Sequence, residues 1–174
     1  MEKNFKQILP AIKAFVFDVD GVLTDGSVML MPDGEQVRTM NIKDGYALQL
    51  AIKKGYYVAI ITGGKSKAIK ARMEGLGVSD IYLGAHNKID SLADFMGIYD
   101  IKYEEILYMG DDIPDYECMQ KVAAATCPSD AAPEIKAICT YISQQPGGKG
   151  CVRDVLEQVM RVQGKWFDGD AFKW

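Results

Sequence analysis

Short hydrophobic runs alternate with amphipathic segments along most of the chain. Four runs are strongly apolar and end in polar or glycine residues, at 14–17, 57–61, 81–83 and 106–109, and a weaker fifth covers 122–126. Runs without polar alternation are typical of strands that are covered on both faces, as in a parallel sheet. The pattern therefore predicts five buried strands.

Helical spacing fills the intervals between these runs. Apolar residues recur at i, i+3, i+4 and i+7 in 89–96 and in 152–160, and residues 44–54 and 66–75 are compatible with helices that end at glycines. Strands that alternate with helices predict a doubly wound, Rossmann-like α/β fold with a parallel sheet. We expect a single domain over residues 1–174.

Residues 27–41 interrupt this alternation. Two extended runs, 28–31 and 36–40, are joined by a segment that contains Asp33 and Gly34. Asp-Gly between extended runs is a hairpin signal, so we expect a small β-hairpin inserted after the first strand. Such an insertion could cover a site or make an oligomer contact. A glycine-rich loop at 145–150 precedes the last helix.

Composition narrows the possible partners and compartments. The 174 residues carry a net charge of −4, and a nucleic-acid partner, which would require a basic surface, is not expected. The four cysteines and the single histidine form no zinc-binding or disulfide pattern, which favours reduced thiols in a cytoplasmic protein. Residues 1–10 contain no long apolar run, which argues against a signal peptide or a membrane span.

Acidic residues follow the first run directly, in the sequence DVDGVLTDG (18–26). Ligands of open α/β sheets bind at the carboxyl ends of the strands. Two neighbouring carboxylates, Asp18 and Asp20, repel each other there and favour a hard cation such as Mg²⁺, which would accompany a phosphate. Taken alone, the segment could also be a polar turn or part of a calcium loop.

Two further strand ends carry polar groups. The run that ends at 61 continues as TGGKS (62–66), where a hydroxyl and backbone N–H groups could hold a phosphate, although the same residues also suit a plain strand-to-helix turn. The run that ends at 109 continues as GDDIPD (110–115), and a helix N-cap explains only one of its three carboxylates. Lys88, between these two segments, begins the helical pattern of 88–97 and by itself would be an ordinary surface lysine.

In this order and spacing, the motifs resemble those of the haloacid dehalogenase superfamily: DxDG, a hydrophobic residue with TG, a lysine, and GDDxxD. The resemblance extends from residue 14 to about residue 163. The hairpin and one helix fill most of the interval between Asp20 and Thr62, so the chain resembles the branch without a cap domain. NIKDG (41–45) and GGKGCVRDV (147–155) resemble segments of one family in that branch, the 3-deoxy-D-manno-octulosonate (KDO) 8-phosphate phosphatases.

The resemblance implies a magnesium-dependent phosphatase that acts through an aspartyl phosphate in the synthesis of a lipopolysaccharide precursor. Asp18 is then the nucleophile, and Asp20 is the general acid and base. Thr62 and the Gly63 amide would hold phosphoryl oxygens, and Lys88 would pair with Asp18 and the transferring group.

The resemblance also implies a metal site and substrate contacts. The metal ligands would be Asp18, the backbone carbonyl of Asp20, and Asp111. Asp112 and Asp115 would support this site by orienting a water molecule or Lys88. Asp115 is also expected among the substrate-binding residues. The remaining contacts to the sugar acid would come from four residues: Asn41, Lys43, Asp44 and Arg72.

One position departs from the family pattern, and three other functions remain open. The family commonly has an arginine where this chain has Gly64, followed by Lys65, so the sugar specificity is unsettled. A nine-carbon keto-acid 9-phosphate is an alternative substrate, although those relatives would have glutamate at position 64. The chain could also be a non-catalytic partner domain of a sugar-acid cytidylyltransferase. A phosphate-transferring enzyme with the same intermediate would have to exclude water.

The resemblance further implies a homotetramer. In the family, hairpins pack together and the C-terminal tail, here about 164–174, reaches the active site of a neighbouring subunit. Phe167, Phe172 and Trp174 would be the interface anchors. The alternative is a frayed tail.

Overall fold

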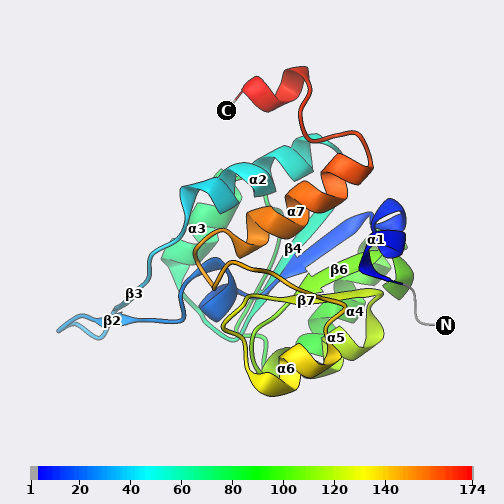
Figure 1. Ribbon diagram of the computed structural model, residues 1–174. Helices are drawn as coiled ribbons and strands as arrows, with labels where there is room; N and C mark the ends of the chain where they lie inside the picture. The colour runs from blue at the N-terminus through cyan, green and yellow to red at the C-terminus, as the bar shows by residue number, and fades with distance from the viewer. Residues whose placement is uncertain (1–3, 174) are drawn as a thin grey trace.

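A parallel six-stranded sheet forms the centre of the computed structural model, which describes residues 4–173 (Figure 1). Its strand order is β5-β4-β1-β6-β7-β8, so β1 is central and the chain winds outward from it in both directions. The strands are β1 (Ala14–Phe17), β4 (Tyr57–Thr62), β5 (Asp80–Leu83), β6 (Ile106–Met109), β7 (Ala124–Cys127) and β8 (Tyr141–Ile142). The five predicted strands are confirmed, and the short edge strand β8 is an addition.

Helices cover both faces of the sheet, as expected for a doubly wound fold. The helices are α1 (Phe5–Ile8), α2 (Ile42–Lys53), α3 (Lys67–Gly75), α4 (Lys88–Tyr99), α5 (Tyr116–Lys121), α6 (Pro133–Ile138) and α7 (Cys151–Val162). Side chains alternate across β1: Phe15 and Phe17 pack in the core with α2, α3 and α7, whereas Ala14 and Val16 pack with α4, α5 and α6. Both layers are visible in Figure 1.

The predicted hairpin is present, but its strands are shorter than the two extended runs, 28–31 and 36–40, that predicted it. β2 (Met29–Leu30) pairs antiparallel with β3 (Gln36–Val37), and Gly34 takes a positive φ of 87° in the connecting turn. Figure 1 shows the hairpin projecting from the body of the molecule. All residues from 25 to 37 are exposed, so no core packing extends the strands further. No cap domain lies between β1 and β4.

The C-terminal tail lies on the subunit's own helix α2. Lys54, which directly follows α2, is within 2.6 Å of Asp168 and 2.7 Å of Asp170, and the Tyr46 hydroxyl donates to the carbonyl of Ala171. Phe167 nevertheless remains 75% exposed and Phe172 70% exposed. The predicted anchor Trp174 lies outside the described residues. Among residues 4–173, no helix is both long and apolar enough to cross a bilayer.

Candidate active site

Three neighbouring strands end together at the predicted site. Phe17 of β1 pairs with Ile60 of β4 and with Met109 of β6. The residues that follow these pairs therefore meet at one edge of the sheet. They include Asp18 after β1, Thr62 at the end of β4 and Asp111 after β6. The sequence motifs, far apart along the chain, are thus brought together by strand register.

A tight turn over Val19–Leu23 carries Asp18 into the loop that contains Asp20. The Thr24 hydroxyl donates to the carbonyl of Val19 and accepts from the amides of Gly21 and Gly26. Gly21 has φ 87°, and a Cβ there would lie only 2.0 Å from Oδ2 of Asp111. A glycine is therefore required both by the turn and by the close approach of the second acidic segment.

Lys88 forms a buried charge network with two aspartates. Its Nζ lies 3.0 Å from Oδ1 of Asp18 and donates to Oδ1 of Asp115 at 2.7 Å. The same Asp115 oxygen accepts from the Tyr108 hydroxyl at 2.8 Å, and its other oxygen accepts from the Asp111 amide at 3.3 Å. Together, these four contacts hold Asp115 in place and keep the Lys88 ammonium beside Asp18. Asp115 itself is fully buried beneath this network.

The electrostatics of this network favour a bound cation. Burial, followed by repulsion from Asp115, raises the pKa of Asp18 to about 7, although Lys88 opposes this shift. Burial and repulsion from Asp18 and Asp115 raise the pKa of Asp111 to about 7. Burial opposes the charged form of Lys88, but attraction to Asp18 and Asp115 raises its pKa overall. The carboxylates therefore carry more repulsion than one lysine offsets.

The acidic groups also have the spacing of a metal site. Asp18, Asp111 and Asp115 each offer a carboxylate oxygen, and these atoms lie within 4.8 Å of one another. Because Asp115 is already committed to Lys88 and Tyr108, Asp18 and Asp111 are the better placed ligands. Carboxylate oxygens are the ligands that Mg²⁺ prefers, so the residues fit this ion.

The sequence did not predict the partner of Asp20. Both oxygens of its carboxylate accept from the Arg38 guanidinium, Oδ1 from Nε at 2.6 Å and Oδ2 from Nη2 at 3.2 Å. Arg38 follows β3 at the base of the hairpin. Arg38 and Asp20 are 18 residues apart and lie in different segments, so no periodic pattern in the sequence relates them. Their contact is therefore visible only in the structure.

The segment after β4 leaves open backbone near these side chains. Thr62 is buried, and its hydroxyl accepts from the Gly64 amide at 3.1 Å. A Cβ at Gly63 would meet nothing within 4 Å, and a Cβ at Gly64 would lie 3.8 Å from Oδ2 of Asp20. There is therefore room beside Asp20 for a ligand that contacts the backbone of this turn.

Comparison with known proteins agrees with this geometry. The family model for haloacid dehalogenase-like hydrolases matches residues 77–153. The 3-deoxy-D-manno-octulosonate 8-phosphate phosphatase of Escherichia coli K12 is 36% identical over 154 residues, which cover 88% of this chain and 82% of the relative. The chain belongs to this phosphatase family.

Solved structures of the phosphatase family have the same fold. The Moraxella catarrhalis enzyme, crystallised with a magnesium ion, a phosphate ion and KDO, is 31% identical with a TM-score of 0.89, and 92% of each chain is covered. The cobalt-bound Haemophilus influenzae enzyme is 28% identical with a TM-score of 0.90, over 95% of this chain and 99% of that chain. The expected haloacid dehalogenase fold is thereby confirmed.

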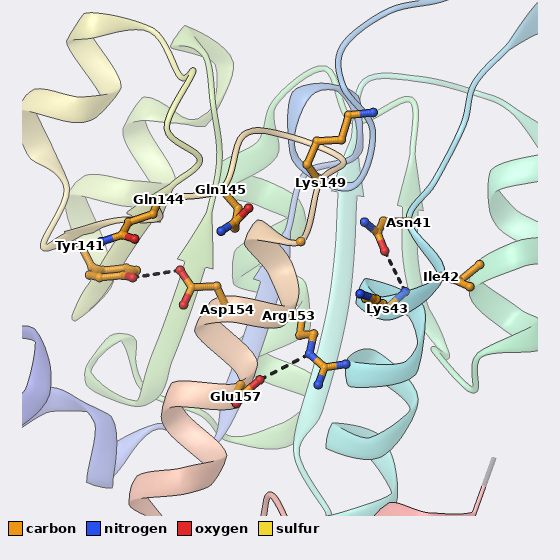
Figure 2. A pocket seen from close by; sticks show the side chains of 11 residues that line it. Asn41, Ile42, Lys43, Tyr141, Gln144, Gln145, Lys149, Arg153, Asp154 and Glu157 are labelled. Atoms are coloured by element: carbon orange, nitrogen blue, oxygen red, sulfur yellow. Dashed lines mark hydrogen bonds and ion pairs between the residues drawn. The ribbon is translucent and has the colours of Figure 1, made fainter.

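A groove of about 680 Å³ lies between the start of α2 and the start of α7 (Figure 2). Asn41 and Lys43 line one side, and Lys149 and Arg153 line the other. The Asn41 side chain caps α2 by accepting from the Lys43 amide at 2.8 Å. The groove is lined by three cations and also by the carboxylates of Asp154 and Glu157, and Glu157 lies 3.4 Å from Nε of Arg153.

Asp44, a predicted substrate contact, has a buried carboxylate beside the start of α7. It is 1% exposed, and its Oδ1 accepts from the Arg153 amide at 2.7 Å. Burial raises its pKa to about 6, while hydrogen bonds from the amides of Arg153 and Gly150 oppose that shift. Asp44 therefore caps the first turn of α7, and its contact with substrate stays a prediction.

The glycine-rich loop before α7 packs against the turn that follows Asp18. The Gly148 amide donates to the carbonyl of Val22 at 2.9 Å. A Cβ at Gly147 would lie 2.0 Å from the carbonyl oxygen of Gly21. Glycine is thus required at Gly147 because two backbone segments touch there. This close approach gives a physical reason for the first glycine of the segment 147–155 that resembles the family.

The remaining predicted residues lie around this centre. Arg72 of α3 borders a second, smaller cavity of about 350 Å³ between α3 and the hairpin, together with Arg38. Asp112 caps a short 3-10 turn by accepting from the Ile113 amide at 2.8 Å. Lys65 packs over Gly84, where an added Cβ would lie 2.7 Å from the lysine Cε.

Proposed function

We propose that this protein hydrolyses 3-deoxy-D-manno-octulosonate 8-phosphate to the free sugar acid and inorganic phosphate. The observation that carries the proposal is the buried contact of Lys88 with Asp18, at the open ends of β1 and β4. Transfer of a phosphoryl group requires a nucleophilic carboxylate, a lysine, and a turn whose backbone is accessible to the phosphoryl oxygens.

Two displacements at phosphorus describe the reaction. An oxygen of Asp18 attacks phosphorus, the bond to the sugar oxygen breaks, and Asp20 gives that oxygen a proton. Water then attacks the aspartyl phosphate and loses a proton to Asp20, which restores Asp18. Thr62, the Gly63 amide and Lys88 hold the phosphoryl oxygens and offset the charge that develops on them.

A Mg²⁺ ion held by Asp18, Asp111 and the Asp20 carbonyl would neutralise charge on the phosphoryl group. With that charge offset, Asp18 would be ionised at neutral pH despite its burial. Asp115 contributes by fixing Lys88.

The substrate's sugar acid would extend toward these two grooves. Asn41 and Lys43 border the larger groove, and Arg72 borders the smaller one. An arginine or lysine pair supplies the charge-assisted hydrogen bonds that a carboxylate requires. Because Gly64 leaves space beside Asp20, a nine-carbon 9-phosphate belongs in the same substrate test.

We also propose a cytoplasmic homotetramer of single-domain subunits. The exposed hairpin supports an assembly, because Met29 is 66% exposed and Leu30 72% exposed. The described cysteines are all free, which agrees with a reducing compartment. Docking of the tail on α2 within one subunit leaves Phe167 and Phe172 available for a neighbour.

The test is phosphate release from a panel of sugar-acid phosphates with Mg²⁺, with Asp18→Asn as the matched variant. We expect the octulosonate 8-phosphate to be hydrolysed fastest and the variant to lose more than about 1,000-fold in kcat. Preference for the nine-carbon ester would keep the mechanism and change the substrate. Absence of release from every ester would refute the proposal and favour a non-catalytic role.

A further inference from the structure

A charged contact attaches the base of the hairpin to the loop that contains Asp20. Residues 25–37 are exposed, whereas the Arg38 side chain is only 11% exposed and the Asp20 side chain 38%. The guanidinium also donates to the Gln36 backbone carbonyl at 3.0 Å and to the Gln36 side-chain oxygen at 3.3 Å. Arg38 is therefore held at the base of the hairpin and directed at Asp20.

This contact differs from two ion pairs that lie on the surfaces of single helices. The pairs of Lys70 with Glu74 and of Lys121 with Glu117 are more than 40% exposed, span one helical turn and have N–O distances of 3.8 and 3.7 Å. Pairs of that kind contribute little. Arg38 instead contacts both oxygens of its partner at short distance, which fixes the plane of the carboxylate as well as its position.

We propose that Arg38 is a positioning residue for Asp20, and that it holds the carboxylate where a proton can pass to the departing oxygen of the substrate. The inference rests on the proposed phosphatase function and adds a residue of the hairpin to it. Asp20 lies beside the open turn at Gly64, 3.8 Å from an added Cβ there, so its carboxylate borders the space that a leaving group would occupy.

The chemistry explains why orientation matters here. When the phosphorus–oxygen bond breaks, its electron pair goes to the sugar oxygen, and a sugar alkoxide is a poor leaving group unless Asp20 supplies a proton. A nitrophenolate leaves without that proton. When Asp20 carries the proton, one of its oxygens still accepts from Arg38, and the two Gln36 oxygens accept from two further guanidinium N–H groups.

A direct contact between Arg38 and the substrate is the competing explanation. Arg38 borders the cavity of about 350 Å³ that also contains Arg72, so a carboxylate of the substrate could reach it. The structure favours positioning, because Nε and Nη2 are both already taken by Asp20. The two explanations differ in which kinetic constant changes and for which ester.

The experiment compares Arg38→Gln, Arg38→Lys and wild type on the octulosonate 8-phosphate and on p-nitrophenyl phosphate, with saturating Mg²⁺. We expect Arg38→Gln to lower kcat for the sugar ester about 10- to 100-fold and kcat for the nitrophenyl ester by less than about 3-fold. Arg38→Lys should recover part of the loss. Arg161→Gln is the matched control, since Arg161 is an exposed arginine of α7 that pairs with Glu157.

Each other outcome overturns the inference. Equal losses on both esters would assign Arg38 to the fold or to the phosphoryl group, and thermal melts of the variants would separate these two cases. A higher KM for the sugar acid with unchanged kcat would make Arg38 a substrate contact. Wild-type protein that hydrolysed neither ester would refute the proposed function itself, and this inference with it.

Discussion

Two regions of this molecule invert the usual distribution of polar and apolar side chains. At the ends of β1 and β6, Asp18, Lys88 and Asp115 are buried. In the hairpin, Met29 and Leu30 are mostly exposed. The buried charges find their partners within the subunit, whereas the exposed apolar residues find none among the described residues. The charges of the first region are paired within one chain, whereas the exposed residues of the second support the proposed contact with another chain.

The buried region is stable only because its charges satisfy one another. Moving an ion into the protein interior costs several kcal/mol, and removal of one partner leaves the other unpaired. Lys88 bridges two carboxylates, and Tyr108 adds a neutral hydrogen bond to one of them. Disruption of this network should therefore affect stability and catalysis together.

The largest effect should follow from Asp115→Asn, which keeps the shape and removes the charge. Lys88 then loses its shorter ion pair, and we expect the free energy of unfolding to fall by about 3 kcal/mol. Because Lys88 also loses its orientation toward Asp18, kcat should fall about 100-fold. Urea unfolding and steady-state kinetics measure the two effects.

Tyr108→Phe is the matched control for this prediction. It removes only the hydroxyl that donates to the same Asp115 oxygen, at an expected cost of about 1 kcal/mol, and leaves the charges in place. If Asp115→Asn were no more destabilising than Tyr108→Phe, the charge network would not be what holds this edge of the sheet.

Asp44 differs from the paired charges around Lys88, because only one oxygen of its buried carboxylate has a hydrogen-bond partner. Its Oδ1 caps α7, but its Oδ2 is buried without a hydrogen bond. Its pKa in the fold, about 6, is above the usual 3.8. The folded state then holds a proton that the unfolded state has released, so stability falls as pH rises from about 4 to 6.

Asp44→Asn should remove this pH dependence. Between pH 5 and pH 7, the wild type should lose about 1 kcal/mol of unfolding free energy more than the variant. Chemical unfolding of both proteins at the two pH values measures the difference. Parallel losses in the two proteins would mean that Asp44 is ionised equally easily in the folded and unfolded states.

The sequence predicted the parts of the site that depend on strand order. Asp18, Thr62 and Asp111 each follow a hydrophobic run, and parallel strands bring such positions to one edge. Arg38 and the capping role of Asp44 were not predicted, because both depend on contacts between segments that no periodicity relates. The helices α5 and α6, of six residues each, were also missed, since they are too short to show a helical repeat.

The smallest effect on the free energy of unfolding is expected in the hairpin, the second of the two regions compared above. Met29→Ser together with Leu30→Ser removes apolar side chains that pack on nothing described in this subunit, so unfolding free energy should change by less than about 0.5 kcal/mol. Light scattering after gel filtration should nevertheless show a lower molecular mass than that of the proposed wild-type tetramer. Ile98→Ser on α4, at a side chain 57% exposed, is the control and should leave the mass unchanged.

A wild-type protein that is monomeric at micromolar concentration would contradict the assignment of the hairpin to an interface. If the double variant is smaller but retains kcat on p-nitrophenyl phosphate, the chemistry at Asp18 is independent of assembly. If it also loses the preference for the sugar ester, the hairpin must be held by a neighbour before Arg38 can orient Asp20. The two inverted regions would then be linked through that one arginine.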